Sequence, residues 1–350
     1  MTNNFKEFIL KNDELIVLLN ILYLNGNSNF NVYPYLIKEK IFSVALEDQV
    51  IIKRLINKNT YNQSLPEKSF PEIIPQYSHL RNILIASGFL KMSNWDTMEA
   101  ELNRIKSIDP LQGQRFTFIG MDTNSYINRI YSVLKNSYKG NISNYFFVLS
   151  RVIEIELRAA RNIPNEQLDE LKADENYKDN LFFLDEFWNG ESISTRIKHI
   201  GRVEFNKLRK QSRCLINNSI ELNGDIESDL QIIEDFRGQI IKQNYDLLLL
   251  SSDKHFEQAR ESGIYSLNLK IPNVDDIPDQ FSGNWQHLCD FIYLNSIYFG
   301  AISFRGPNNT IQIYGLWRGK STEDWDSESV KIRIGSKTII DLLEQQLKII

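Results

Sequence analysis

Apolar residues recur at helical spacing along the first third of the chain. Phe5, Phe8 and Ile9 form a first group, and a second group is broken by the polar turn at residues 25–29. The second group consists of Leu15, Leu18, Leu19 and Leu22. A proline-containing loop follows, marked by Pro66, Pro71 and Pro75. This pattern predicts a mostly helical N-terminal domain over residues 1–114.

The segment 79–90 has the pattern of a helix that stops at Gly88 and leads into a short strand. A helix followed by Gly-Phe-Leu resembles the recognition helix and wing of a winged helix, which would make residues 41–90 a DNA-binding element. Plain helical packing is the simpler interpretation of the same pattern. On that interpretation, His79 caps a helix or lies at the surface.

From residue 115 to 271, short apolar runs alternate with helical stretches, a pattern typical of a parallel α/β sheet. The run that begins at Phe116 ends in Met121-Asp122-Thr123-Asn124, and polar residues of this kind can cap a following helix. The run at 246–250 is also followed by a carboxylate, Asp253. Two further runs occupy residues 146–149 and 264–269. We predict a parallel sheet flanked by helices.

The last part of the chain, residues 272–350, begins with a proline-containing linker and continues with a mixed pattern. An apolar helical stripe covers 285–299, and Gly306-Pro307-Asn308-Asn309 between two apolar runs is a hairpin signature. Residues 330–334 alternate as in a strand, and a final helix is expected after Ser336. We predict a small C-terminal α+β module.

The composition narrows the possible classes of protein. A chain of 350 residues has material for two or three domains.

Cys214 and Cys289 are the two cysteines, and their spacing fits neither a disulfide framework nor a zinc site, so a reducing, cytoplasmic location is expected. The start of the chain lacks a signal sequence and no segment predicts a membrane span. A net charge of −5 argues against a generally basic nucleic-acid coat but allows local basic patches.

Four acidic residues stand at two predicted strand ends, at a helix start and on a helix face. Because the carboxyl ends of parallel strands meet at one edge of a sheet, their side chains are expected to converge there. They are Asp122, Glu156, Asp235 and Asp253. Buried together, unpaired carboxylates would cost several kcal/mol unless a cation compensates them. The pattern therefore indicates an acidic metal site.

The order of these motifs resembles the PIN domain of metal-dependent ribonucleases. The resemblance covers about residues 115–271 and rests on short motifs taken together. They are Asp-Thr-Asn at 122–124, the segment 150–157 ending in Glu-Leu, Asp235 on a penultimate helix, and Leu250-Ser251-Ser252-Asp253 followed by Gly263-Ile264. Where PIN domains commonly have Thr-x-Asp, this chain has Ser251-Ser252-Asp253, so a hydroxyl is retained.

The resemblance implies that the four acids bind Mg²⁺ or Mn²⁺ and that Asn124 and Ser251 orient ligands from a second layer. Two assignments stay open at this stage. Asp235 comes 79 positions after Glu156, and the insert between them is longer than compact members have, so Asp229 and Glu234 compete with Asp235. Glu154 competes with Glu156, which is preferred because it is expected to start a helix.

A basic segment lies within this insert, at residues 191–213. Seven basic residues stand against two acidic ones there, a local net charge of +5. The basic residues are Arg196, Lys198, Arg202, Lys207, Arg209, Lys210 and Arg213. Such a segment could hold the phosphate backbone through contacts that do not depend on sequence, or it could be a solvated basic helix.

Together these features predict a Mg²⁺- or Mn²⁺-dependent endoribonuclease with a PIN-like nuclease domain at 115–271. The helical N-terminal domain and the C-terminal module would guide the choice of RNA or of a regulatory protein partner, and a homo-oligomer is also compatible with the chain. One alternative is a catalytically inactive PIN-like module that binds RNA or protein. A further alternative is a DNA-associated regulator with an N-terminal winged helix.

Overall fold

The computed structural model describes residues 5–37, 39–66, 70–138, 140–175, 183–184, 190–216, 228–253 and 256–349. The chain forms two compact units. Unit 1 comprises residues 1–90, 160–197 and 277–350, and unit 2 comprises residues 91–159 and 198–276. The units are therefore not the three consecutive segments 1–114, 115–271 and 272–350 that the sequence predicted.

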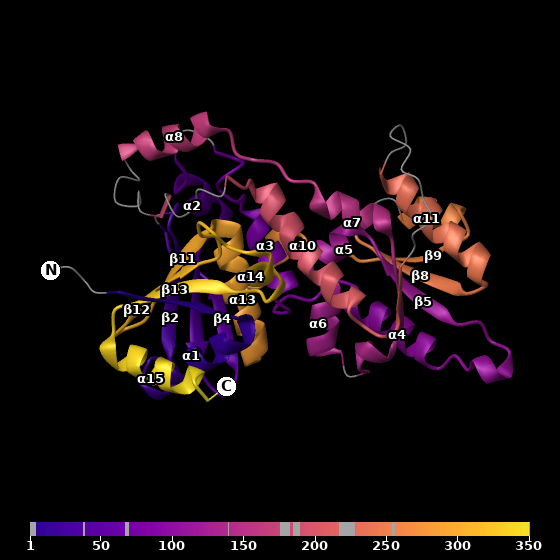
Figure 1. The fold of residues 1–350 in the computed structure, drawn as a ribbon, viewed down its shortest axis with the longest axis horizontal. Coiled ribbons are helices and arrows are strands. Elements are labelled where there is room, and N and C mark those ends of the chain that lie inside the picture. Colours follow the sequence, from indigo (N-terminus) through magenta and orange to yellow (C-terminus); the bar gives the residue numbers. More distant parts are fainter. Residues whose placement is uncertain are drawn as a thin grey trace. The chain divides into compact units, whose positions relative to one another are not determined.

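Unit 1 is built on an eight-stranded antiparallel sheet with the order β1-β13-β12-β11-β2-β3-β4-β10. Its strands are β1 (Lys6–Leu10), β2 (Asn29–Pro34), β3 (Phe42–Leu46), β4 (Val50–Arg54), β10 (Gln280–Gly283), β11 (Ala301–Arg305), β12 (Thr310–Tyr314) and β13 (Val330–Ile334). Strands from both ends of the chain alternate in this sheet, seen as indigo and yellow arrows in Figure 1. This pairing is why the two ends of the chain belong to one unit.

The prediction of a mostly helical N-terminal domain is wrong, because four strands lie within residues 1–54. In β3 the side chains of Phe42, Val44 and Leu46 are buried and alternate with less buried neighbours, which is the period of a strand. Ten of the sixteen residues from 41 to 56 are apolar, and so dense a pattern fits helical spacing as well as strand spacing. Residues 88–90 form a turn rather than a strand, so the helix-then-wing order of a winged helix is not what this segment adopts.

The helices of unit 1 include one that is almost wholly buried. This helix, α13 (Trp285–Phe299), is capped by the Asn284 side chain, which accepts a hydrogen bond from the backbone N–H of His287 at 2.8 Å. It packs against α1, α3 and strand β11. The others are α1 (Asn12–Leu24), α2 (Lys58–Gln63), α3 (Ser78–Ala86), α8 (Asn165–Ala173), α14 (Thr322–Asp326) and α15 (Lys337–Leu347). The predicted C-terminal hairpin and final helix are confirmed as β11–β12 and α15.

Gly315, which follows β12, approaches the backbone of α13 so closely that no side chain fits. A Cβ atom there would lie 2.5 Å from the backbone nitrogen of Ile297 and closer still to the carbonyl group of Ser296. We expect Gly315→Ala to lower the free energy of unfolding by about 3 kcal/mol, since backbone atoms cannot move aside cheaply. Denaturant unfolding would measure this, with Gly335→Ala as the control, because its Cβ would meet Phe5 at an ordinary 3.4 Å. Equal stability of the two variants would contradict the packing argument.

His79 lies in the first turn of α3, and its neutral side chain bonds to the backbone just before the N-cap residue Tyr77. Its Nδ1 accepts a hydrogen bond from the backbone N–H of Gln76 at 2.9 Å. Burial lowers the pKa of His79 to about 4, and the charges of Arg81 and Arg196 act in the same direction. A protonated imidazole would lose the bond to Gln76, because Nδ1 would then be a donor.

Protonation of His79 should therefore destabilise the protein in acid. The pKa of His79 in the folded protein lies below the value of 6.5 for the free side chain. The stability that the neutral imidazole contributes is therefore complete above pH 6.5 and is lost as the pH falls towards 4. The loss reaches about 3 kcal/mol at most, at 1.36 kcal/mol per pH unit. Unfolding curves at pH 7 and pH 4.5 should show it, and the His79→Asn variant should show a smaller difference. An unchanged pH dependence in that variant would rule out this cause.

Unit 2 contains the predicted parallel α/β sheet, which has five strands in the order β7-β6-β5-β8-β9. The strands are β5 (Thr117–Met121), β6 (Phe146–Leu149), β7 (Cys214–Ile216), β8 (Asp246–Ser251) and β9 (Tyr265–Asn268). Its helices are α4 (Trp95–Lys106), α5 (Thr123–Ile127), α6 (Ile130–Ser137), α7 (Arg151–Arg158), α11 (Ser228–Gln243) and α12 (Phe256–Glu261). Helix α10 (Ile193–Arg209) has its residues from Lys198 onwards in this unit.

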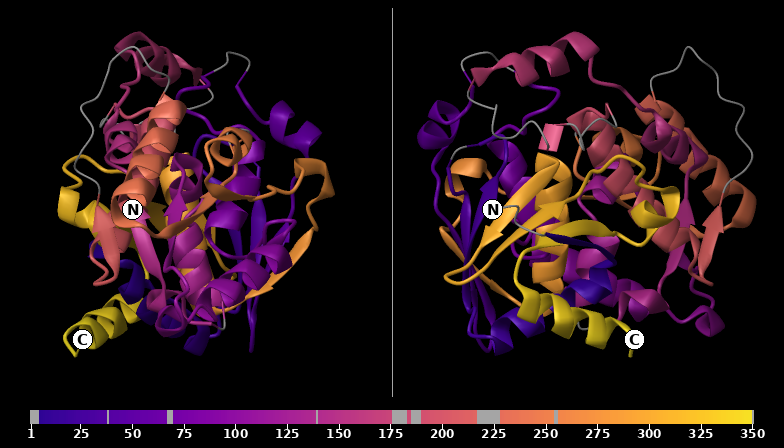
Figure 2. Two further views of the ribbon diagram at one scale, coloured as in Figure 1. Left: turned by 90° about the vertical axis from the view of Figure 1, so that its right-hand side faces the viewer. Right: turned by 60° about the vertical axis from the view of Figure 1, so that its left-hand side comes forward.

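The helices of unit 2 approach one another and the sheet at glycines. Gly201 on α10 lies where a Cβ would be 2.7 Å from Leu157 on α7 and 3.2 Å from Ile127 on α5. Gly120 on β5 lies against the ring of Phe236 on α11, the orange helix that flanks the sheet in Figure 2. These contacts fix the helices that carry the candidate site residues against the central strands.

Candidate metal centre at the end of the parallel sheet

The two central strands of the parallel sheet, β5 and β8, form a topological switch point. From β5 the chain proceeds outwards through β6 and β7, whereas β8 and β9 lie on the other side of β5. Met121 pairs with Leu250, so Asp122 and Ser251 follow at the same end of neighbouring strands. In open α/β sheets, ligands bind beside the carboxyl ends of the strands at such a point. The predicted strand-end acids Asp122 and Asp253 both lie here.

Asp122 connects the two central strands through its carboxylate. Its Oδ1 accepts the backbone N–H of Ser125 at 2.6 Å, which caps α5. Its Oδ2 accepts the hydroxyl of Ser251 at 2.7 Å and the backbone N–H of Ser252 at 3.1 Å. Burial raises the pKa of the Asp122 carboxyl, and the bonds from Ser125, Ser251 and Ser252 offset only part of this rise. A bound cation would favour the charged form of such a carboxylate.

Ser251 and Asn124 bring Asp253 into the same cluster. The hydroxyl of Ser251, which donates to Asp122, also accepts the backbone N–H of Asp253 at 3.2 Å. The side-chain amide of Asn124 donates to Oδ2 of Asp253 at 3.4 Å. Ser251 thus contacts Asp122 and Asp253, and Asn124 contacts Asp253. These contacts form without a metal.

Glu156 reaches the cluster through the residue next to Asp122. The hydroxyl of Thr123 donates to Oε2 of Glu156 at 2.6 Å. Glu156 lies in the second turn of α7, which starts after the cap residue Ser150, and not at a helix start as expected from sequence. Since residues two apart on a helix point in different directions, Glu154 lies on another side, where it pairs with Arg158 and Arg209. The described contacts thus join Glu156, rather than Glu154, to the Asp-Thr-Asn motif.

Asp235 occupies a different setting from these three acids. It lies on α11 with 1 % of its surface exposed, next to Phe236 in the sequence. Its charge is one cause of the raised pKa of Tyr245 at the start of β8. The rival Glu234 is exposed, and the side chain of the other rival, Asp229, lies outside the described residues. Within the described part of the chain, no three His, Cys, Asp or Glu side chains are grouped so that they could hold a metal ion.

The basic segment is mostly helical, and one of its residues has to be reassigned. Arg196 has 0 % of its surface exposed, and its guanidinium donates to the carbonyl oxygens of Glu191, Tyr298 and Ile73 within unit 1. The prediction that it binds substrate is therefore wrong. In a helix that packs against the protein, about every third or fourth residue faces the interior. A net charge counted over the segment does not show which of its basic residues does so.

The other basic residues of the segment reach solvent to different degrees. Half-buried side chains belong to Lys198, Arg202 and Lys207, and exposed ones to Arg209, Lys210 and Arg213. Two of the exposed residues have structural contacts in unit 2. Arg209 pairs with Glu154 at 3.2 Å, and Arg213 donates to the carbonyl oxygen of Asn144 and lies over the ring of Phe146.

Sequence reasoning missed Thr123, Ser125 and Ser252, which donate the hydrogen bonds that hold the acids in place. The signal was present in the run Asp-Thr-Asn-Ser after a strand, since its hydroxyls and N–H groups had to find acceptors. Their partners lie 33 to 130 residues away, apart from Ser125, whose partner is local. Only the sheet order brings those distant partners within reach.

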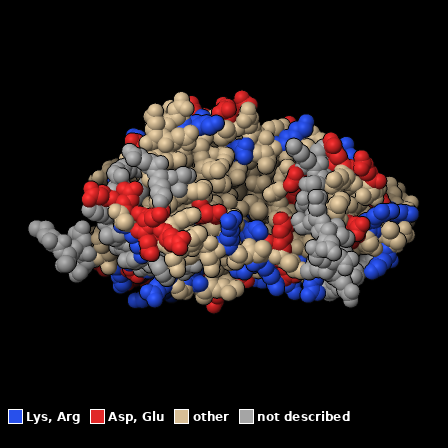
Figure 3. Space-filling view, turned by 90° about the horizontal axis from the view of Figure 1, so that it is seen from above, with Lys and Arg blue, Asp and Glu red and all other residues tan. Residues whose placement is uncertain are grey.

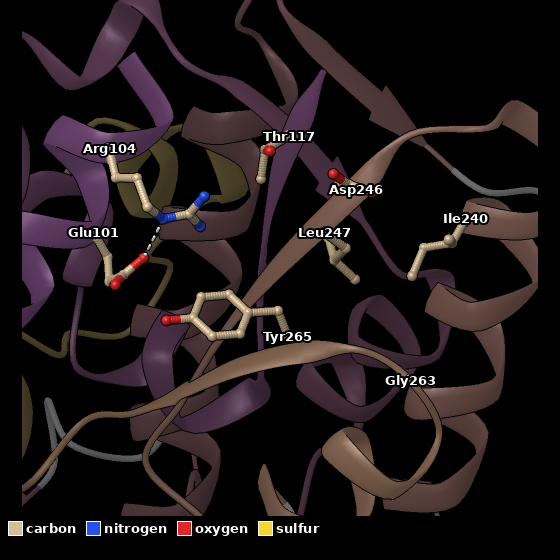
Figure 4. A pocket seen from close by; sticks show the side chains of 8 residues that line it. All are labelled: Glu101, Arg104, Thr117, Ile240, Asp246, Leu247, Gly263 and Tyr265. Carbon is tan, nitrogen blue, oxygen red and sulfur yellow. Dashed lines mark hydrogen bonds and ion pairs between the residues drawn. The ribbon is translucent and has the colours of Figure 1, made fainter. Parts of the chain in front are cut away.

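A cavity of about 510 Å³ lies at the opposite end of the strands β5 and β8 (Figure 4). Thr117 and Asp246, which start β5 and β8, line it together with Tyr265 of β9. On its other side, Arg104 donates to Glu101 at 2.8 Å and lies over the ring of Tyr265. This cavity thus lies apart from the strand-end acids.

Unit 2 is therefore an α/β unit with a parallel sheet and a cluster of carboxylates and hydroxyls at its switch point. No protein-family model, no curated protein and no solved structure matches the chain. None of the described helices is long and apolar enough to cross a membrane. On the face drawn in Figure 3, basic and acidic side chains are interspersed, so nucleic acid that contacts this face would have to use local groups of arginines and lysines.

Proposed function

We propose that unit 2 is a PIN-like, Mg²⁺- or Mn²⁺-dependent nuclease that hydrolyses RNA phosphodiester bonds. The observation that carries this proposal is the cluster at the switch point, where Ser251 bridges Asp122 to the backbone of Asp253. Glu156 is joined to the same motif through Thr123. Asp235 stays in the proposal as the fourth acid on the ground of the family resemblance alone.

In chemical type, the donors suit a hard divalent cation. They are carboxylate and hydroxyl oxygens, which are the ligands that Mg²⁺ and Mn²⁺ prefer. When bound, the cation would activate water and offset charge on the leaving oxygen.

The chain's own residues would prepare this site. The Ser251 hydroxyl and the Ser252 N–H fix the rotamer of Asp122, so that its carboxylate does not have to reorganise when a cation binds. Asn124 orients Asp253, and Thr123 orients Glu156. The exposed residues Arg209, Lys210 and Arg213 are proposed to contact RNA phosphates, together with the half-buried Lys198, Arg202 and Lys207.

The test is a titration of Mn²⁺ into the wild-type protein by calorimetry, followed by incubation with single-stranded RNA in Mn²⁺ or in EDTA. We expect saturable Mn²⁺ binding and cleavage that EDTA abolishes. Absence of both would refute the nuclease proposal.

A second candidate function is a non-catalytic PIN-like module that binds RNA or protein. It is favoured by the hydrogen bonds of Asp122, because both oxygens already cap α5 and tie β5 to β8 without a metal. Salt-sensitive RNA binding without metal-dependent cleavage would favour this candidate. A cytoplasmic location, a homo-oligomer and a regulatory partner remain further parts of the proposal.

A further inference from the structure

A second, basic cavity of about 310 Å³ lies beside α7 in unit 2. It is lined by Arg151, Glu154, Ile155, Arg158, Arg209 and Ile216. Three guanidinium groups thus face one carboxylate, which leaves an excess of two positive charges among the lining residues. Of the three arginines, only Arg209 belongs to the basic segment 191–213, and Arg151 and Arg158 lie outside it.

Glu154 positions two of the three arginines. Its Oε1 accepts hydrogen bonds from Arg158 at 2.5 Å and from Arg209 at 3.2 Å. The side chain of Glu154 is 14 % exposed, whereas those of Arg158 and Arg209 are 62 % and 48 % exposed. The carboxylate is therefore inside and the guanidiniums face solvent. A guanidinium has five N–H donors, so each arginine keeps donors for a ligand after its bond to Glu154.

The cavity lies at the same end of the sheet as the strand-end acids. Ile216, in its lining, pairs with Leu149 at the last position of the β6–β7 ladder. Glu154 and Glu156 are two residues apart on α7, and they face the arginines and the Asp-Thr-Asn motif respectively. One helix thus carries a residue of each site.

We infer that this cavity binds a phosphate group of a nucleic-acid strand. Guanidinium groups match phosphate in charge and in planar, bidentate geometry. A volume of about 310 Å³ is within the range of ligand cavities and exceeds what a bare ion needs, so a sugar can accompany the phosphate. Ile155 and Ile216 supply apolar wall for that sugar. The inference rests on the proposed function for the identity of the strand as RNA, whereas phosphate binding itself requires no metal.

The test uses a short oligouridylate with a fluorescent 3′ label, titrated in EDTA so that cleavage cannot interfere. The Arg151→Gln/Arg158→Gln variant should bind it about tenfold more weakly, and the slope of log affinity against log salt should fall by about 0.7 for each lost contact. The matched control is Arg115→Gln/Lys242→Gln. It removes two exposed positive charges, one just before the start of β5 and one in the last turn of α11. Equal loss of affinity in both variants would overturn the inference.

Two further arms define the ligand. The first arm compares an oligouridylate that has a 5′-hydroxyl with one that has a 5′-phosphate. If the arginine variant binds both more weakly than the wild type does, the cavity holds an internal phosphate. If it binds only the 5′-phosphorylated one more weakly, the cavity holds the terminal phosphate. In the second arm, polyglutamate competes with the labelled oligouridylate. If it displaces the label from the wild type as well as unlabelled RNA does, but not from the arginine variant, the assignment to phosphate is overturned. The arginine variant could bind RNA more weakly while the wild-type protein fails to bind Mn²⁺ and to cleave RNA. That result would support this inference and refute only the nuclease proposal.

Discussion

Asp253→Asn is expected to lower Mn²⁺-dependent RNA cleavage by about 100-fold or more, while the protein remains folded. Asp253 is half-buried at the end of β8, and its Oδ2 accepts a hydrogen bond from Asn124 at 3.4 Å. Asparagine keeps the shape and one acceptor oxygen but removes the negative charge that a divalent cation needs. Initial cleavage rates at saturating RNA, with calorimetric Mn²⁺ titration of the same sample, would measure the effect.

The strand that carries Asp253 also offers its control. Asp246 is exposed at the opposite end of β8, so Asp246→Asn removes the same charge from the same strand far from the switch point. We expect this variant to cleave RNA at the wild-type rate. Wild-type Mn²⁺ binding and cleavage in Asp253→Asn would exclude Asp253 as a metal ligand and overturn the assignment of cleavage to the acidic cluster.

Asp122→Asn is a less decisive variant, although the motif begins with this residue. Both Asp122 oxygens accept N–H or O–H donors, so an amide nitrogen at either position would face a donor. The mismatch should cost about 1 to 3 kcal/mol of stability. A loss of activity in this variant could then arise from unfolding, which is why its thermal unfolding has to be measured beside its activity.

Arg196→Met is expected to lower the free energy of unfolding by about 3 to 5 kcal/mol. The buried guanidinium donates to three carbonyl oxygens from separate segments of unit 1, those of Glu191, Tyr298 and Ile73. Burial lowers the pKa of Arg196 to about 9, so the group is still charged at pH 7. Methionine fills part of the space but leaves the carbonyls without these donors.

Denaturant unfolding of Arg196→Met and of Arg202→Met would test this assignment. Arg202 lies on the same helix and is half-buried, and methionine preserves most of the packing of its aliphatic stem, so we expect less than about 1 kcal/mol of change there. A folded Arg196→Met variant of wild-type stability that has lost RNA binding would restore the substrate-binding interpretation.

The sequence by itself determined the local features of this protein. The alternation of apolar runs with helical stretches predicted the parallel sheet of unit 2, and the hairpin signature predicted β11 and β12. Asp122 was recognised as a residue able to cap a helix, and it caps α5. These features depend on residues that are neighbours along the chain, where spacing and side-chain chemistry are enough to define them.

The tertiary structure alone decided which distant segments meet. Nothing in the sequence of Lys6–Leu10 shows that it pairs with Val330–Ile334, and this pairing is what joins the ends of the chain in unit 1. Likewise, only the alignment of Met121 with Leu250 places Asp122 within reach of Ser251. The burial of Arg196 has the same origin, because its carbonyl partners come from segments up to 123 residues away. Strand pairing and burial depend on the whole chain, so local spacing cannot specify them.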